Sequence, residues 1–355
     1  MSGTEDACAT LCIGLDLAWF GGSANDPWSK FDCLATARLD AEGRLLCTEI
    51  QRVPSKKGKG NENPDASQLA TAILSLVSGV NRSARVVLAI DAPLQAKATG
   101  LPPRTPVPRK GSVKRRACDI ELDRRRKVID KNAGGSDGWH PNIQPGAPLV
   151  ARVQHLLEGL RKEFQLWTNE HTSEQQTIIE CFPAEAIWAA KRQGHYPAHF
   201  TAARAKAYKA QKGCSLTAEQ VRAVVEDALL TPFTSITETS EEWEQMVAQI
   251  VHWLLNDDKW KTGVRYRGGK MLDDVVDAAI CMATAISYAK GHHHVWQDRK
   301  NPDDGHIIGP GLMDSQLTTN AELAVPEQRR EKTRALKQAM MKERLTGRTR
   351  LVEEP

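Results

Sequence analysis

Four aspartates lie in three short apolar segments, and their positions suit the binding of divalent metal. Asp16 ends a strand-like run in CIGLDLAW, and Asp91 ends another in VVLAIDAPL. Asp274 and Asp277 lie three residues apart in LDDVVDAAI, so they share one face of the helix that this segment predicts. Mg²⁺ and Mn²⁺ prefer carboxylate oxygens to sulfur. The four side chains are therefore candidate ligands for two such ions, which could activate a water for phosphodiester hydrolysis.

Each aspartate also has a simpler interpretation. A single aspartate at the end of a strand is often a turn or cap residue, and motifs this short match by chance. The joint arrangement favours the metal site, because converging acids are a costly way to end apolar strands.

Strand-like and helix-like patterns place these segments in one sheet. The first three strands are joined by connections too short for a crossover helix, which predicts an antiparallel meander. Helices and strands alternate after it, so the predicted fold is mixed α/β, with a five-stranded mixed sheet flanked by helices. The predicted strands cover residues 11–18, 31–38, 44–53, 84–90 and 176–181. The predicted helices cover residues 66–78, 148–164 and 272–289, and two more begin at Pro183 and Ser240.

Two insertions and a tail extend the predicted catalytic domain of residues 10–310. Residues 95–148 are rich in Pro, Gly and basic residues and are too long for an ordinary connection, which predicts a functional loop. Residues 196–269 predict a helical insertion, and residues 311–355 a charged C-terminal tail. Three histidines, His292 to His294, follow the last helix and predict an exposed turn.

Composition narrows the functional classes without naming one. The 355 residues carry a formal net charge of +4, so the overall charge points to no class of partner. Eight cysteines are scattered and form no CxxC pair, which argues against zinc-ribbon and dithiol redox sites. The sequence shows no leader-like N-terminus and no long uncharged apolar run. We therefore expect a reduced, soluble, cytoplasmic protein.

A basic segment follows Asp91. Between Arg104 and Lys131 the chain has eleven Lys and Arg against four Asp and Glu. This connection brings positive charge to the carboxylate end of the sheet, where it would neutralise nucleic-acid phosphates with little sequence preference. A solvated loop or an arginine–acid network is the alternative interpretation. The candidate substrate-binding residues are Arg109, Lys110, Lys114, Arg115, Arg116, Asp119, Arg124 and His140.

Six motifs together resemble a predicted nuclease family, domain of unknown function 429. They are GLDLAW, AIDAPL, RACD, ECFP, DDVVDAAICMATA and GHIIGP, in that family's order over about residues 10–310. The resemblance implies an RNase H-like fold of the Holliday-resolvase branch and metal-dependent hydrolysis of phosphodiester bonds in DNA or RNA. It implies two Mg²⁺ or Mn²⁺ ions held by the catalytic residues Asp16, Asp91, Asp274 and Asp277. Glu180, in the ECFP motif, is a further candidate catalytic residue.

Two other functions stay open at this point. A non-catalytic nucleic-acid or protein adaptor could keep this fold without efficient turnover. A phosphotransferase of the sugar-kinase and actin superfamily would share the sheet order and the Gly-x-Asp strand. Such an enzyme needs a second glycine- and hydroxyl-rich phosphate loop, and the sequence has no recognisable one. Metal-dependent binding would separate the nuclease from the adaptor, and ATP binding would favour the phosphotransferase.

Overall fold

The computed structural model of the chain describes residues 8–17, 31–54, 66–94, 118, 146–166, 175–183, 240–256, 268–297 and 305–310. All of them belong to one compact unit, which comprises Met1–Glu121 and Gly138–Leu312. A second unit, Leu122–Asp137 with Met313–Pro355, lies outside the described residues. Most of the two predicted insertions and the whole predicted tail lie outside them as well.

A mixed sheet forms the centre of the described unit, as the sequence predicts. Its strand order is β3-β2-β1-β4-β6-β5. β2 pairs antiparallel with β1 and β3, whereas β4 pairs parallel with β1 and β6. The five main strands are β1 Thr10–Asp16, β2 Phe31–Leu39, β3 Leu45–Pro54, β4 Arg85–Ile90 and β6 Gln176–Glu180. The two-residue strand β5, Gln165–Leu166, adds an edge that the sequence did not predict.

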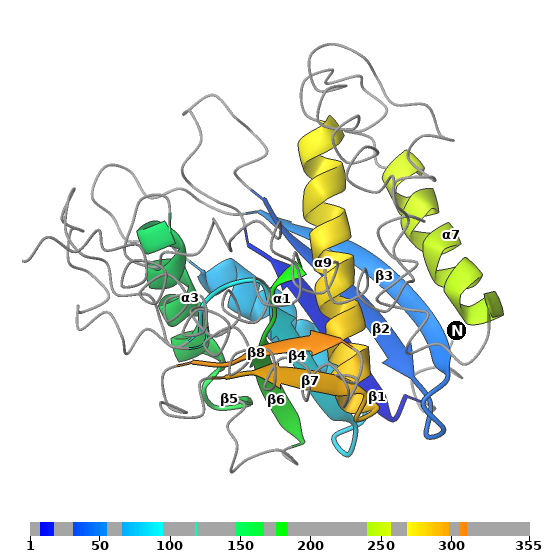
Figure 1. The fold of residues 1–355 in the computed structure, drawn as a ribbon, viewed down its shortest axis with the longest axis horizontal. Helices are drawn as coiled ribbons and strands as arrows, with labels where there is room; N and C mark the ends of the chain where they lie inside the picture. The colour runs from blue at the N-terminus through cyan, green and yellow to red at the C-terminus, as the bar shows by residue number, and fades with distance from the viewer. Residues whose placement is uncertain are drawn as a thin grey trace, which may run out of the picture. The chain divides into compact units, whose positions relative to one another are not determined.

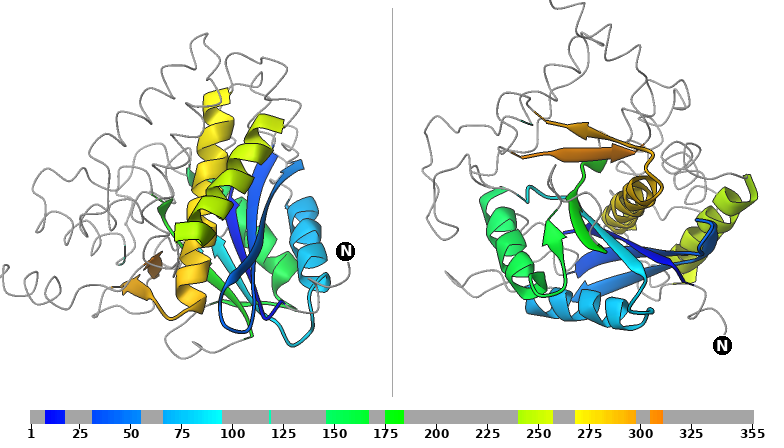
Figure 2. Two further views of the ribbon diagram at one scale, coloured as in Figure 1. Left: turned by 90° about the vertical axis from the view of Figure 1, so that its right-hand side faces the viewer. Right: turned by 90° about the horizontal axis from the view of Figure 1, so that it is seen from below.

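Helices cover both faces of the sheet. Helix α1 (Ser67–Ser78) and helix α3 (Gly146–Leu160) lie on one face, and helix α7 (Ser240–Asn256) and helix α9 (Gly268–Ala289) lie on the other (Figure 1 and Figure 2). Strands β1 and β4 are buried on both faces, which explains why their sequences are almost continuous apolar runs. None of the helices in the described ranges combines the length and apolar character needed to cross a membrane.

The segment after α9 differs from the prediction. His293–Trp296 forms β7 and Ile307–Pro310 forms β8, which pair antiparallel. β8 also makes a parallel bridge to Cys181 at the end of β6. The prediction of an exposed histidine turn is therefore wrong for His294, which is buried against Gly309 and lies edge-on to the Trp296 ring. Val295 and Trp296 suit a strand, and pairing with β8 extends that strand back to His293.

Gly14 sets the distance between β1 and α9. A Cβ atom at this position would overlap the carbonyl oxygen of Ala278 and the amide nitrogen of Met282. Both are backbone atoms of α9, which cannot move aside as the tip of a flexible side chain can. The strand and the helix are therefore in direct backbone contact, which only glycine permits.

We predict that Gly14→Ala destabilises the protein by about 3 kcal/mol or more, because the added methyl group must push α9 away from β1. The measurement is urea unfolding followed by circular dichroism. Gly79→Ala is the matched control, since its Cβ would meet the nearest atom at an ordinary 3.5 Å and its φ of −83° suits alanine. Equal unfolding midpoints for the two variants would contradict the close contact.

Candidate active site

Asp16 and Asp91 lie next to each other at the ends of two adjacent parallel strands. Leu15 pairs with Ile90, and the Asp91 N–H donates a hydrogen bond to the Leu15 carbonyl oxygen at 3.0 Å. Side chains alternate along a strand, so both aspartates share the face of Cys12, which packs in the α9-side core. Asp16 is 5% exposed and Asp91 is 8% exposed. Two carboxylates so removed from water favour a compensating positive charge.

Asp274 and Asp277 come to the same end of the sheet from α9. The Gly14 contact places the turn that begins at Ala278 beside β1. Asp274 precedes Ala278 by one helical turn, about 5.4 Å. Asp16 follows Gly14 by two strand residues, about 6.7 Å. Both helix aspartates are half-buried. If α9 runs opposite to β1, these matching displacements bring Asp274 level with Asp16, whereas Asp277 lies one residue before Ala278 and so nearer the level of Gly14.

The end of α9 establishes that direction. Arg85 pairs with Thr10 at the start of β1, and its side chain donates a hydrogen bond to the Ala289 carbonyl oxygen at the end of α9 at 3.0 Å. Cys33 pairs with Asp16 across β1 and β2. Burial raises the pKa of this thiol well above its usual value, and the charges of Asp16 and Asp274 raise it further, whereas Arg52 lowers it. Asp16 and Asp274 both act on this buried thiol, in agreement with the first turns of α9 lying at the Asp16 end of β1.

Two further thiols connect the remaining aspartates. Cys181 at the end of β6 and Cys281 on α9 share a hydrogen bond. Burial raises the pKa of both thiols, and Asp91 raises both further. Asp277 also raises the pKa of Cys181, and Asp16 raises that of Cys281. Asp16 and Asp91 thus both act on Cys281, while Asp274 shares Cys33 with Asp16, and Asp277 shares Cys181 with Asp91.

This set of side chains fits a hard divalent cation. The four candidate ligands are all carboxylates, and the neighbouring thiols stay protonated at neutral pH, so they do not compete as soft ligands. Among the residues that the structure describes, no three His, Cys, Asp or Glu side chains are already arranged to hold a metal. We therefore expect cation binding to draw the carboxylates closer together.

Glu180 occupies the opposite face of the sheet. It pairs with Ile90, so its side chain shares the face of Ile90, which packs in the core beneath α1 and α3. Its Oε2 atom accepts a hydrogen bond from the Leu94 N–H at 2.8 Å, and Gln154 of α3 donates to the Leu94 carbonyl oxygen at 3.1 Å. These two contacts fix the segment that follows Asp91. The structure therefore shows a positioning contact for Glu180, and its catalytic role stays a prediction.

A buried ion pair holds α3 where Gln154 can make that contact. Arg152 forms a two-pronged pair with Asp32 of β2, and the two side chains are 1% and 0% exposed. Removing one partner of such a pair typically costs about 3–5 kcal/mol, because the other charge is left buried. Sequence analysis missed this pair, since its members are 120 residues apart and Asp32 alone resembles the polar position of an alternating strand.

The predicted substrate-binding residues of the basic segment lie outside the described residues. They are Arg109, Lys110, Lys114, Arg115, Arg116, Asp119, Arg124 and His140. Cys118, within the same RACD motif, is described and is fully buried. The phosphate contacts expected of this segment therefore stay a prediction.

Comparison with known proteins gives a family. The family model described as "Protein of unknown function (DUF429)" matches residues 34–301, more than half of the chain. The chain belongs to this family. The match covers Asp91, Glu180, Asp274 and Asp277 of this DUF429 protein, but it begins within β2, after Asp16. No curated protein and no solved structure matches the chain. The predicted family is confirmed, and its description carries no activity.

We predict that Glu180→Gln leaves the stability of this DUF429 protein within about 1 kcal/mol of the wild type, because the amide oxygen can still accept from the Leu94 N–H. Glu180→Ala should cost about 1–3 kcal/mol, since it leaves that buried N–H unsatisfied. Urea unfolding measures both values. Equal destabilisation by the two substitutions would contradict the positioning contact. A role as a metal ligand would instead appear as lost Mn²⁺ affinity in Glu180→Gln at unchanged stability.

We predict that the buried Cys12 thiol lowers the free energy of unfolding at alkaline pH. Burial raises the pKa of this fully buried thiol from 9.0 to about 12. A raised pKa stabilises the fold fully below the unfolded value and loses that contribution as pH rises towards the folded value. At pH 10 the loss is about 1.4 kcal/mol. We expect Cys12→Ala to lose that much less stability than the wild type between pH 8 and pH 10 in urea unfolding. Identical pH dependence would refute the shift.

Proposed function

We propose that this DUF429 protein is a divalent-metal-dependent nuclease that hydrolyses nucleic-acid phosphodiester bonds. The observation that carries the proposal is the position of Asp16 and Asp91 at the ends of adjacent parallel strands, on the face that α9 covers. Burying two carboxylates in this position costs folding free energy, whereas their oxygen atoms are suitable ligands for a hard cation. The aspartates of α9 add two more oxygen donors from the same side.

The topology supports an RNase H-like fold for this nuclease. An antiparallel meander of β1, β2 and β3 leads into the parallel strands β4 and β6, and the last long helix packs across β1. Acids end the first and fourth strands, and two more lie on that helix. The motif resemblance implies acids at these same positions of an RNase H-like fold.

In this proposal, some residues of the chain would bind the metal ions and others would exclude water from the site. Asp16, Asp91, Asp274 and Asp277 would hold two Mg²⁺ or Mn²⁺ ions. When bound, such ions supply an activated water and stabilise the leaving oxygen of a phosphodiester. The apolar side of α9 keeps bulk water away from Asp16 and Asp91, which strengthens their attraction for a cation. Glu180 and Gln154 hold the backbone beyond Asp91 in place.

The inference that the partner is a nucleic acid depends on the basic segment that follows Leu94 in the sequence. Its Lys and Arg residues would contact the phosphate backbone of DNA or RNA, whereas the buried carboxylates would act on one phosphodiester at a time. Such contacts predict binding that weakens as salt increases.

We expect the purified protein to cleave at least one labelled single-stranded, double-stranded, hybrid or branched substrate in Mg²⁺ or Mn²⁺, and EDTA to abolish cleavage. Asp16→Asn and Asp91→Asn should each lower the rate by about a hundredfold or more, because each removes an anionic ligand. The measurement is the initial rate of product formation on denaturing gels. Glu42→Gln, an exposed acid in the β2–β3 turn, is the matched control and should leave the rate unchanged.

Cleavage that survives Asp16→Asn, or its absence from every substrate with both metals, would rule out the nuclease. Calorimetry with Mn²⁺ then separates the remaining interpretations. A nuclease site binds Mn²⁺ and loses that affinity in Asp16→Asn. An adaptor binds nucleic acid equally well with and without metal.

A further inference from the structure

Arg52 lies in the same row of the sheet as the candidate metal ligands. Asp16 pairs with Cys33 on β2, and Cys33 pairs with Arg52 on β3. Arg52 is therefore two strands from Asp16, about 10 Å at the usual spacing of strands. It also alternates with Ile50, which packs in the α9-side core, so Arg52 and the carboxylates share one face of the sheet. This row therefore has carboxylates at its centre and a cation towards its β3 edge.

Helix α7 orients this cation. The Cζ atom of Arg52 lies 5.7 Å from the centroid of the Trp253 ring, within range of a cation–π contact. Trp253 is itself partly buried against the α9-side core, so the ring is held in place. A guanidinium with its side-chain freedom reduced in this way loses less entropy on binding, and its geometry matches two phosphate oxygens at once.

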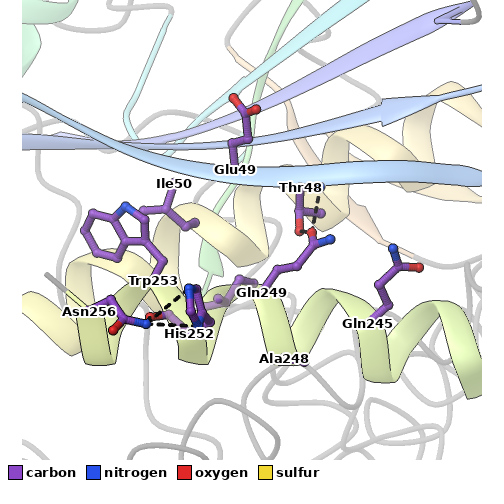
Figure 3. A pocket seen from close by; sticks show the side chains of 10 residues that line it. Thr48, Glu49, Ile50, Gln245, Ala248, Gln249, His252, Trp253 and Asn256 are labelled. Carbon is purple, nitrogen blue, oxygen red and sulfur yellow. Dashed lines mark hydrogen bonds between the residues drawn. The ribbon is translucent and has the colours of Figure 1, made fainter. Parts of the chain in front are cut away.

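A groove of about 770 Å³ lies between β3 and α7, on the Trp253 side of this contact (Figure 3). Trp253 lines it, and so do hydrogen-bonding side chains from α7, namely Gln245, Gln249, His252 and Asn256. In Figure 3 Gln249 points at Thr48, whose N–H donates to the Gln249 Oε1 atom at 2.8 Å, and Glu49 lies on the other side of the strand. The volume is typical of sites for small ligands or single residues.

The chemistry of this groove suits one nucleotide. An aromatic ring offers a stacking surface that accepts any base, and amide side chains can hydrogen-bond the edge of a base. Without bound metal, the aspartates at the centre of the row repel a phosphate. A cation beside them therefore favours the binding of a nucleic-acid strand that crosses this end of the sheet. Arg52 supplies that cation at the β3 edge.

We propose that Arg52 binds a substrate phosphate beside the carboxylates and that the β3–α7 groove receives the adjoining nucleotide of a single strand. This inference rests on the proposed function, because that function places the cleaved phosphodiester at Asp16 and Asp91. It assigns α7, whose role the sequence left open, to substrate binding.

The test is fluorescence anisotropy with a short, labelled single-stranded oligonucleotide, as DNA and as RNA, in EDTA and over about 50–200 mM salt. We expect Arg52→Ala in the full-length protein to weaken binding about tenfold and to lower the slope of log Kd against log salt by about one. Trp253→Ala should weaken binding about tenfold with the slope unchanged, since stacking releases no counterions.

Arg44→Ala is the matched control, because Arg44 is an exposed arginine in the β2–β3 turn at the other end of the strands. It should bind like the wild type. Arg52→Lys keeps the charge and should keep the slope of log Kd against log salt. If Arg52→Ala fails to fold, Arg52→Lys and Trp253→Ala together replace it in the test. Wild-type affinity and slope in Arg52→Ala, or no binding of either oligonucleotide by the wild type, would overturn the inference.

This experiment is independent of turnover. If the protein cleaves no substrate but its oligonucleotide binding depends on Arg52, the proposed nuclease activity is wrong and the nucleotide site is supported. Cleavage that needs Asp16 but not Arg52, with unaltered oligonucleotide binding in Arg52→Ala, would do the reverse.

Discussion

The backbone contact between Gly14 and α9 is the constraint on which the rest of the site depends. With no side chain between them, the strand and the helix lie closer than any other residue at this position would allow. That closeness brings Asp274, one helical turn before Ala278, level with Asp16. It also excludes water from the space between them, so the carboxylates act on buried thiols through a medium of low polarity.

Buried polar contacts on the other face of the sheet support the site. There the Arg152–Asp32 pair fixes α3, Gln154 reaches from α3 to the Leu94 carbonyl, and Glu180 binds the Leu94 amide. These contacts are polar yet buried, so each is costly to break. A site of like charges needs such a frame, because mutual repulsion would otherwise push apart the strand ends that carry Asp16 and Asp91.

Local pattern predicted most of the elements. Apolar runs that end at Asp16 and Asp91 identified β1 and β4. Helical spacing of apolar residues identified α7, whose Met246 and Ile250 are buried. The histidines after α9 and the partners of Asp32 and Glu180 escaped prediction. Their roles depend on pairing with β8, on Arg152 and on the backbone of Leu94, all distant in sequence.

The sequence by itself identified the candidate acidic residues from their type and position in short motifs. The periodicity of apolar residues predicted the mixed sheet, and the order of the motifs predicted the family. Only the tertiary structure decided which face each acid occupies and what lies beside it. Strand register put Asp16, Asp91 and Arg52 on one side and Glu180 on the other. Register is set by contacts among strands far apart in the chain, and a shift of one residue would reverse every one of those faces.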